Sequence, residues 1–533
     1  MNCLALEQDG EVILIDCGVT FDHRGLGVDV VHPDFAPLDA YDGRIRGVVL
    51  THGHEDHIGA VAYLLRRFDV PIYGPPYALG LLRARAEEHE VLHHAALRPT
   101  EPRQPFRVGP FRIEPVRVTH SIADATALAI TTAAGTVVHT GDFKIDDDPP
   151  DGEHFDTERF RELGDAGVSL LFSDSTNIDA HGPTGSEAGV AKVLEELVAS
   201  APAAVVVGLF ASNVHRLRIL GAVAEATGRK IVTLGRSMGT HSRVARSTGY
   251  LSWPDDRVVP LERARELPKR SILALATGTQ AETNAALSRL ARGEQPALML
   301  APGDRVILSS RTIPGNEPQV HGLMAQLLRL GVDLHSWATD RGVHVSGHAH
   351  RIEQRRMLEL VRPRSFVPVH GTLHHLHRHA ALARETGVGD VHVLENGDVA
   401  ELDERGVRKV GRVPTGRTFV AFGREVPWAA LRERIALAEA GVVMVVVRID
   451  DSGALVGKPE VTLLGIADEE GRADLVEDVH TEVREALADL TARERRDDSA
   501  LREAARLAAR RAVTRYTGQK PLAVASVARA QRL

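Results

Sequence analysis

Short apolar runs that end abruptly in polar residues are the main pattern of the first part of the chain. Residues 12–15 are apolar and lead into Asp16, and residues 47–50 lead into a segment rich in histidine. Such runs, bounded by turn residues, predict buried strands. His120 and Asp142 follow further segments of the same kind. We therefore expect several strands that present polar side chains at their carboxyl ends.

From about residue 187 the pattern changes to alternating strands and helices, and near residue 344 it returns to strands followed by histidines. A domain interrupted by an inserted α/β domain would produce this return. Residues 415–427 are rich in Gly, Arg and Pro and predict a linker. A small α+β unit is expected after it. The predicted division is 1–187 for the first part of the main domain, 188–345 for the insertion, 346–425 for the return and 440–533 for the C-terminal unit.

Size and composition narrow the class of protein. A chain of 533 residues is expected to form two or three domains. We expect no membrane partner, because no apolar stretch approaches the roughly 20 residues that span a bilayer. The N-terminus carries no secretion signal, and two cysteines are too few for a disulfide framework, which predicts a cytoplasmic location. The net charge of −8 leaves nucleic-acid binding open, because such binding requires only a local basic groove.

The 26 histidines occur in tight groups, and the densest of these predicts a metal site. His52, His54, Asp56 and His57 follow directly after a predicted strand. Single histidines are more often core or surface residues than ligands. Burying three imidazoles and a carboxylate together without metal would be costly, however. Nitrogen and oxygen donors without sulfur suit a catalytic Zn²⁺ or Mn²⁺ site.

This cluster resembles the signature of the metallo-β-lactamase superfamily, and Asp16, His120 and Asp142 match its other motifs in order. Residues 173–177, 345–350 and 368–371 are similar to the three β-CASP motifs of nucleic-acid-processing members. Segments 210–216, 235–238 and 313–316 resemble the ribonuclease J family, and the similarity runs from Met1 to about residue 530. The resemblance implies an α/β fold: a metallo-β-lactamase αββα sandwich, an inserted β-CASP domain and a small C-terminal α+β domain.

The family resemblance also implies roles for individual residues. His52, His54 and His120 would hold one zinc ion, Asp56, His57 and His370 the other, and Asp142 would bridge them. From the chemistry of the reaction, His348 is our candidate to supply a proton to the leaving oxygen, and we expect Asp16 and Asp174 to orient metal ligands. The residues expected to bind substrate are Ser212, Asn213, His344, Val345, Ser346, Gly347 and His348. Ser212 and Asn213 have a simpler alternative role at the N-terminus of a helix.

The function implied is a ribonuclease with two Zn²⁺ per subunit, or Mn²⁺, that hydrolyses phosphodiester bonds of single-stranded RNA. The family suggests combined endonuclease and 5′-to-3′ exonuclease activity, a preference for a 5′-monophosphate, and a homodimer or homotetramer. These features imply a role in rRNA processing and mRNA decay.

Three alternatives remain at this stage: a β-CASP nuclease that acts on DNA, a non-catalytic RNA-binding subunit, and a small-molecule hydrolase such as a lactonase or thioesterase. Family members usually begin with a strand and a glycine-rich turn ahead of the segment at Met1, so we expect either a start upstream or an uncovered sheet edge.

Overall fold

The computed structural model describes residues 1–22 and 24–529, and these form two compact units. The larger unit comprises Met1–Thr20 and His32–Arg417, and the smaller one comprises 21–31 and 418–533. Residues 530–533, the last of the predicted C-terminal unit, lie outside the described residues. No helix in the described ranges combines the length and apolar character needed to cross a membrane.

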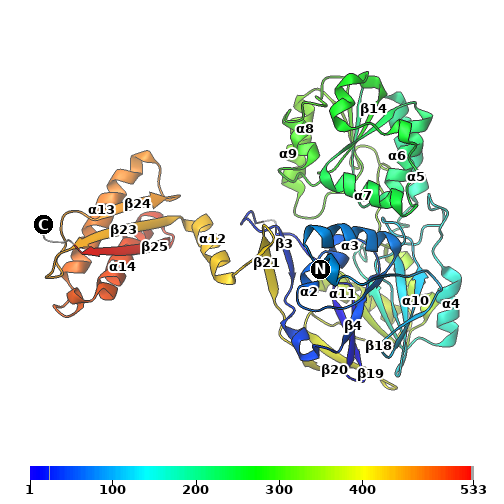
Figure 1. Ribbon diagram of the computed structural model, residues 1–533, viewed down its shortest axis with the longest axis horizontal. Coiled ribbons are helices and arrows are strands. Elements are labelled where there is room, and N and C mark those ends of the chain that lie inside the picture. Colours follow the sequence, from blue (N-terminus) through cyan, green and yellow to red (C-terminus); the bar gives the residue numbers. More distant parts are fainter. Residues whose placement is uncertain (23, 530–533) are drawn as a thin grey trace. The chain divides into compact units, whose positions relative to one another are not determined.

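Two sheets face each other in the main domain (Figure 1). The order β1-β2-β4-β5-β6 defines the first sheet, and β18-β17-β11-β10-β9-β8-β7 defines the second. Ile13 and Val49 of the first sheet pack in one apolar cluster with Phe111, Leu128 and Val367 of the second. The strands of the first sheet are β1 (Leu4–Gln8), β2 (Glu11–Ile15), β4 (Ile45–Val49), β5 (Ile72–Gly74) and β6 (Leu97–Pro99). Those of the second are β7 (Phe106–Val108), β8 (Phe111–Arg117), β9 (Thr126–Thr132), β10 (Gly135–His139), β11 (Leu170–Asp174), β17 (Ser365–Val369) and β18 (Asp390–Val391).

Helices accompany both sheets, which confirms the predicted α/β fold. Helix α1 begins within the histidine cluster, directly after His54, so its first turn contains the candidate metal ligands Asp56 and His57. The helices are α1 (Glu55–Ile58), α2 (Val61–Leu65), α3 (Pro76–Glu88), α4 (Thr157–Ala166), α10 (Arg351–Val361) and α11 (Leu373–Glu385). A hairpin of β19 (Asp398–Asp403) and β20 (Gly406–Arg412) follows them.

The insertion leaves the second sheet after β11 and returns at β17. These two strands are parallel neighbours, with Asp174 opposite Val369, although many residues separate them in the chain. The inserted strands form a parallel sheet in the order β13-β14-β12-β15-β16, with helices on both faces (Figure 1). Its strands are β12 (Val205–Gly208), β13 (Lys230–Leu234), β14 (Ile272–Ala276), β15 (Arg305–Leu308) and β16 (Asp333–Ser336). Its helices are α5 (Glu187–Ser200), α6 (Val214–Ala226), α7 (Arg236–Ser247), α8 (Ala286–Ala291) and α9 (Glu317–Arg329).

The predicted linker at 415–427 was wrong as a structural assignment. This segment contains β21 (Arg417–Ala421) and β22 (Arg424–Val426), which pair antiparallel through the turn at Phe422 and Gly423. Gly and Arg in this segment mark a tight hairpin, and the sheet is completed by β3 (Val30–Pro33), which is distant in sequence. Local composition carries no information about such a distant partner.

The smaller unit has its own apolar core. Leu475 and Val479 of α13 and Ala505 of α14 pack on Val443 and Val445 of the sheet β24-β23-β25. The elements are α12 (Trp428–Ala440), β23 (Val442–Ile449), β24 (Glu460–Leu464), α13 (Glu469–Ala488), α14 (Asp498–Thr517) and β25 (Leu522–Arg529). These form a small α+β unit of the predicted kind.

Candidate metal centre

The candidate ligands, and Asp16 as the predicted orienting residue, lie where strands of the two facing sheets end. Asp16 follows β2, His52 follows β4, Asp142 follows β10 and His370 follows β17. Asp16 and His370 adopt left-handed backbone conformations, with φ of 59° and 54°. Non-glycine residues adopt this conformation at a cost, which is typical of functional sites. The turns aim these side chains into the space between the sheet ends.

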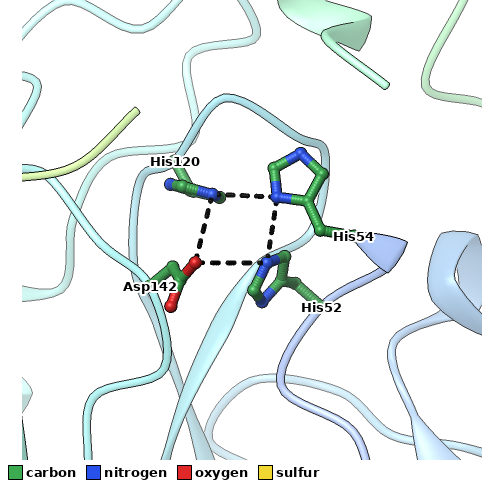
Figure 2. Close-up of side chains that lie close together, drawn as sticks. All are labelled: His52, His54, His120 and Asp142. Atoms are coloured by element: carbon green, nitrogen blue, oxygen red, sulfur yellow. Dashed lines mark hydrogen bonds and ion pairs between the residues drawn. The ribbon is translucent and has the colours of Figure 1, made fainter. Parts of the chain in front are cut away.

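His52, His54, His120 and Asp142 form the first group, and their donor atoms point toward one another (Figure 2). His54 Nδ1 lies 3.1 Å from both His52 Nε2 and His120 Nε2. Asp142 Oδ2 lies 3.8 Å from His52 Nε2 and 3.9 Å from His120 Nε2. Donors in a tetrahedron around zinc, at bond lengths near 2.1 Å, are about 3.4 Å apart. The group therefore has the size and donor chemistry of a zinc site.

Asp56, His57 and His370 form a second group with the same Asp142. His57 Nε2 is 3.2 Å from Asp142 Oδ2 and 3.5 Å from Asp56 Oδ2. His370 Nε2 is 3.0 Å from Asp56 Oδ2 and 3.5 Å from Asp142 Oδ2. Because one carboxylate belongs to both groups, the arrangement suits two neighbouring cations bridged by Asp142. All the residues predicted as ligands are brought together.

The outward nitrogen of each of three rings is held by a neighbour. His57 Nδ1 contacts Asp16 Oδ2 at 2.7 Å, and His120 Nδ1 contacts the Gly347 carbonyl at 2.6 Å. His370 Nδ1 contacts Thr176 Oγ1 at 2.6 Å. When the outward N–H donates, the inner nitrogen keeps its lone pair for a metal, which is the usual arrangement around ligating histidines. Asp16 thus lies where an orienting residue is needed.

Burial and neighbouring charges set the protonation states of several candidate ligands. Burial lowers the pKa of His52 well below its ordinary value and that of His54 to about 4, so both rings are neutral at pH 7. Burial opposes the charged form of Asp142, yet His370 and His57 hold the pKa of this carboxyl well below its usual range. The neutral forms of His52 and His54 and the ionised form of Asp142 are the states that bind metal.

His348 and Asp174 lie beside the second group. His348 Nδ1 is 2.8 Å from Asp174 Oδ2, and its side chain keeps 23% of its exposure. Although burial acts in the opposite direction, Asp174 raises the pKa of His348. Asp174 Oδ1 also lies 3.4 Å from His370 Nδ1 and accepts a hydrogen bond from Thr176. The carboxylate is therefore placed to orient both His348 and His370.

The predicted substrate-binding residues occupy two places. In the loop of residues 344–348, Ser346 Oγ accepts a hydrogen bond from Asn177, and Gly347 lies against His120. His344 Nδ1 is buried without a hydrogen-bond partner among the described residues. Asn213 caps α6 by accepting from the Arg216 amide at 2.9 Å, and Ser212 precedes it. The helix-capping role proposed for Asn213 is thus confirmed.

Several residues of the site were missed by the sequence analysis. Thr51 bonds to Asp16, and Thr176 links His370 to Asp174. Asn2 Nδ2 lies 3.0 Å from His57 Nε2 and 3.3 Å from Asp56 Oδ2. The two threonines stand inside motifs and were detectable by position, whereas nothing near Asn2 signals a contact with residues 56 and 57.

Comparison with known protein families gives matches along most of the chain. The metallo-beta-lactamase superfamily model matches residues 2–179, and the Ribonuclease J beta-CASP domain matches residues 203–327. The Zn-dependent metallo-hydrolase RNA specificity domain matches residues 340–394, and the Ribonuclease J C-terminal domain matches residues 429–530.

Curated relatives named Ribonuclease J align over most of the chain. The protein from Synechocystis is 41% identical over 470 residues, covering 87% of this chain and 73% of the relative. The protein from Mycolicibacterium smegmatis is 37% identical over 524 residues, covering 97% of this chain and 92% of the relative. A solved protein of unknown function from Enterococcus faecalis aligns with a TM-score of 0.51 at 16% identity, covering 78% of this chain and 96% of that one. The last similarity concerns the fold alone.

Proposed function

Because the chain belongs to the ribonuclease J family and is thereby a metal-dependent ribonuclease, we propose that it hydrolyses single-stranded RNA with two Zn²⁺ per subunit, for which Mn²⁺ can substitute. The observation that carries this proposal is the pair of donor groups that share Asp142. In the proposed arrangement His52, His54 and His120 hold one ion, and Asp56, His57 and His370 hold the other. Two bound divalent ions supply an activated water and neutralise charge on the phosphoryl group.

The side chains of the protein would complete the reaction. Asp174 holds Nδ1 of His348 at 2.8 Å, which leaves Nε2 to hand a proton to the departing 3′ oxygen. The pKa of His348, raised by Asp174 against the effect of burial, favours a ring that carries this proton near neutral pH. Asp16 and Asp174 act as positioning residues through His57 and His370.

We place the RNA phosphates along the loop of residues 344–348 and the N-terminus of α6. Backbone N–H groups at a helix start attract phosphate, and Ser212 adds a hydroxyl there. His344 in the same loop is a further candidate contact, because its buried Nδ1 has no hydrogen-bond partner among the described residues. A terminal 5′-monophosphate is the ligand we propose for the N-terminus of α6, which would direct 5′-to-3′ exonuclease cleavage beside endonuclease cleavage. We further propose a cytoplasmic homodimer or homotetramer that forms through the C-terminal unit.

The test compares RNAs that differ only at the 5′ end. End-labelled 5′-monophosphate and 5′-triphosphate RNAs of one sequence are incubated with the protein, with Zn²⁺ or Mn²⁺ and with chelator. We expect mononucleotides mainly from the monophosphate RNA, and no product with chelator. Chelator-resistant cleavage would contradict the metal mechanism. Binding of RNA without any cleavage would favour the non-catalytic subunit, and equal cleavage of single-stranded DNA would favour a DNA nuclease.

The role of His348 can be separated from metal binding. Alanine at His348 removes the proton donor but none of the proposed ligands, so we expect kcat to fall by about 10²-fold while the bound metal is unchanged. The pH–rate profile should also lose its limb on the alkaline side, because a general acid is lost as it deprotonates. Metal content by elemental analysis and kcat against pH are the measurements. Loss of metal from this variant would instead make His348 a ligand.

A further inference from the structure

The two cysteines of the chain lie next to the paired ends of strands β1 and β2, beside the metal centre: Cys3 directly precedes β1, and Cys17 follows β2 by two residues. Strands β1 and β2 pair antiparallel with Leu4 opposite Ile15. Beyond this pair, the Gly18 amide donates to the Asn2 carbonyl at 2.9 Å. Between these two pairings the first strand contributes only Cys3, whereas the second contributes Asp16 and Cys17. This is a β-bulge, with Asp16 in the left-handed conformation.

The bulge places Cys3 and Cys17 across from each other. Cys17 is fully buried and Cys3 is exposed, and both are free thiols. Burial raises the pKa of the Cys17 thiol, and a hydrogen bond that this thiol donates to the Cys3 sulfur raises it further, in agreement with side chains that lie next to each other. Opposed residues of regular antiparallel strands have Cα atoms about 4.5–5.5 Å apart and disulfides require about 4.4–6.8 Å, so two residues that face each other across a bulge next to this pairing lie near the required range.

We propose that Cys3 and Cys17 form a reversible disulfide in the presence of a peroxide and that this bond weakens the second metal site. The exposed Cys3 thiol reduces the peroxide, gives water and becomes a sulfenic acid. The Cys17 thiol then attacks this sulfur, forms the S–S bond and releases a second water. A thiol reductant restores both cysteines. In a reducing compartment a disulfide of this kind is transient, as in redox-sensing proteins.

The backbone around the bulge connects the cysteines to the candidate ligands. The Cys17 amide donates to the His57 carbonyl at 2.6 Å, and the Asn2 amide donates to the Asp56 carbonyl at 2.9 Å. A Cβ on Gly18 would lie 1.7 Å from the Asp56 carbonyl oxygen, so the backbone at the bulge packs directly against the backbone of Asp56 and His57.

Closing the disulfide must bring the two sulfur atoms from contact to a bond length of about 2.05 Å, and the adjacent Asp16 would move with the Cys17 backbone. Asp16 Oδ2 holds His57 Nδ1 at 2.7 Å. Disturbing a residue that orients a ligand typically lowers metal affinity or activity by about 10- to 100-fold. This effect on the metal rests on the proposed function, whereas formation of the disulfide does not.

The test uses the full chain treated with hydrogen peroxide and then with dithiothreitol. Intact mass and peptide mapping should show a bond between Cys3 and Cys17, with the loss of two hydrogens, that the reductant reverses. Co²⁺ titration, followed by absorption and without RNA, should show at least about tenfold weaker binding of one ion to the oxidised protein. RNA cleavage should fall and recover in parallel.

Cys3→Ser is the matched control, because this exposed residue contacts none of the proposed ligands through its side chain, and peroxide should leave its Co²⁺ binding unchanged. Free thiols in treated wild type, or a sulfinic acid on Cys3 with Cys17 reduced, would overturn the disulfide. A mapped disulfide with unchanged Co²⁺ affinity would overturn its effect on the metal. The mass result stands whether or not the protein cleaves RNA, so the two proposals fail separately.

Discussion

Alanine in place of His54 should abolish RNA cleavage. His54 Nδ1 lies 3.1 Å from both His52 Nε2 and His120 Nε2, at the centre of the first donor group. Without it, that group keeps two histidines and the Asp142 carboxylate that it shares with the second group, which weakens binding of its ion, and the activated water is lost with the ion. We expect kcat/KM to fall by at least about 10³-fold, because two-metal hydrolysis depends on both ions. Initial rates on 5′-monophosphate RNA at saturating Zn²⁺ measure the loss.

His321→Ala provides the matched control, since His321 is an exposed histidine of α9 outside the donor groups. It should retain full activity and full metal content. For His54→Ala, elemental analysis should find about one ion fewer per chain, and circular dichroism should find the fold intact. Metal-dependent turnover that persists in His54→Ala would reject the proposed ligand set.

The ligand residues could be predicted from the sequence because each lies next to a strand end or in a tight group. His52, His54, Asp56 and His57 are nearly consecutive, so their proximity needs no tertiary information. His370 is different, since its place beside Asp142 depends on β17 pairing with β11 after the whole inserted domain. Only the family resemblance connected it to the others. The contact of Asn2 with His57 depends on a backbone bulge, which no side-chain pattern encodes.

Elements stabilised by distant partners were likewise difficult to predict. Strand β1 has an alternating pattern of partly buried and exposed residues, with few strong apolar signals, and was not predicted. The hairpin of β21 and β22 was assigned as a linker because its Gly and Arg residues are typical of loops. Among the histidines 374–379, His374 is exposed on α11 and pairs with Asp179, as a helix surface should. His379 is fully buried and bonds to Ser175, which the composition of that run does not reveal.

A buried ion pair connects the inserted domain to the proposed substrate loop. Arg216 and Glu187 are both almost completely buried, and the guanidinium contacts both carboxylate oxygens at 2.8–2.9 Å. Arg216 also donates to the carbonyl oxygens of Ser309 and Val343, the latter directly before His344. A guanidinium that forms two hydrogen bonds with one carboxylate fixes the relative orientation of the two groups and also pairs their charges. The arginine therefore joins α5, α6, the end of β15 and the loop that begins at Val343.

Arg216→Ala should cause the largest loss of stability among single substitutions in this domain. It leaves the Glu187 carboxylate buried and unpaired, which typically costs about 3–5 kcal/mol. Arg216→Met combined with Glu187→Gln removes both charges at similar volume and should recover much of this loss, because no buried ion remains. Thermal and urea unfolding measure both effects. If the double variant is stable but its KM for RNA is raised, the hydrogen bond from Arg216 to Val343 serves the substrate loop separately from its role in the fold. Burial acts to raise the pKa of Glu187, and Arg216 and then Lys144 lower it. If Arg216→Ala unfolds like the wild type, the pair contributes no net stability, and Lys144 is the cation left to compensate the buried charge.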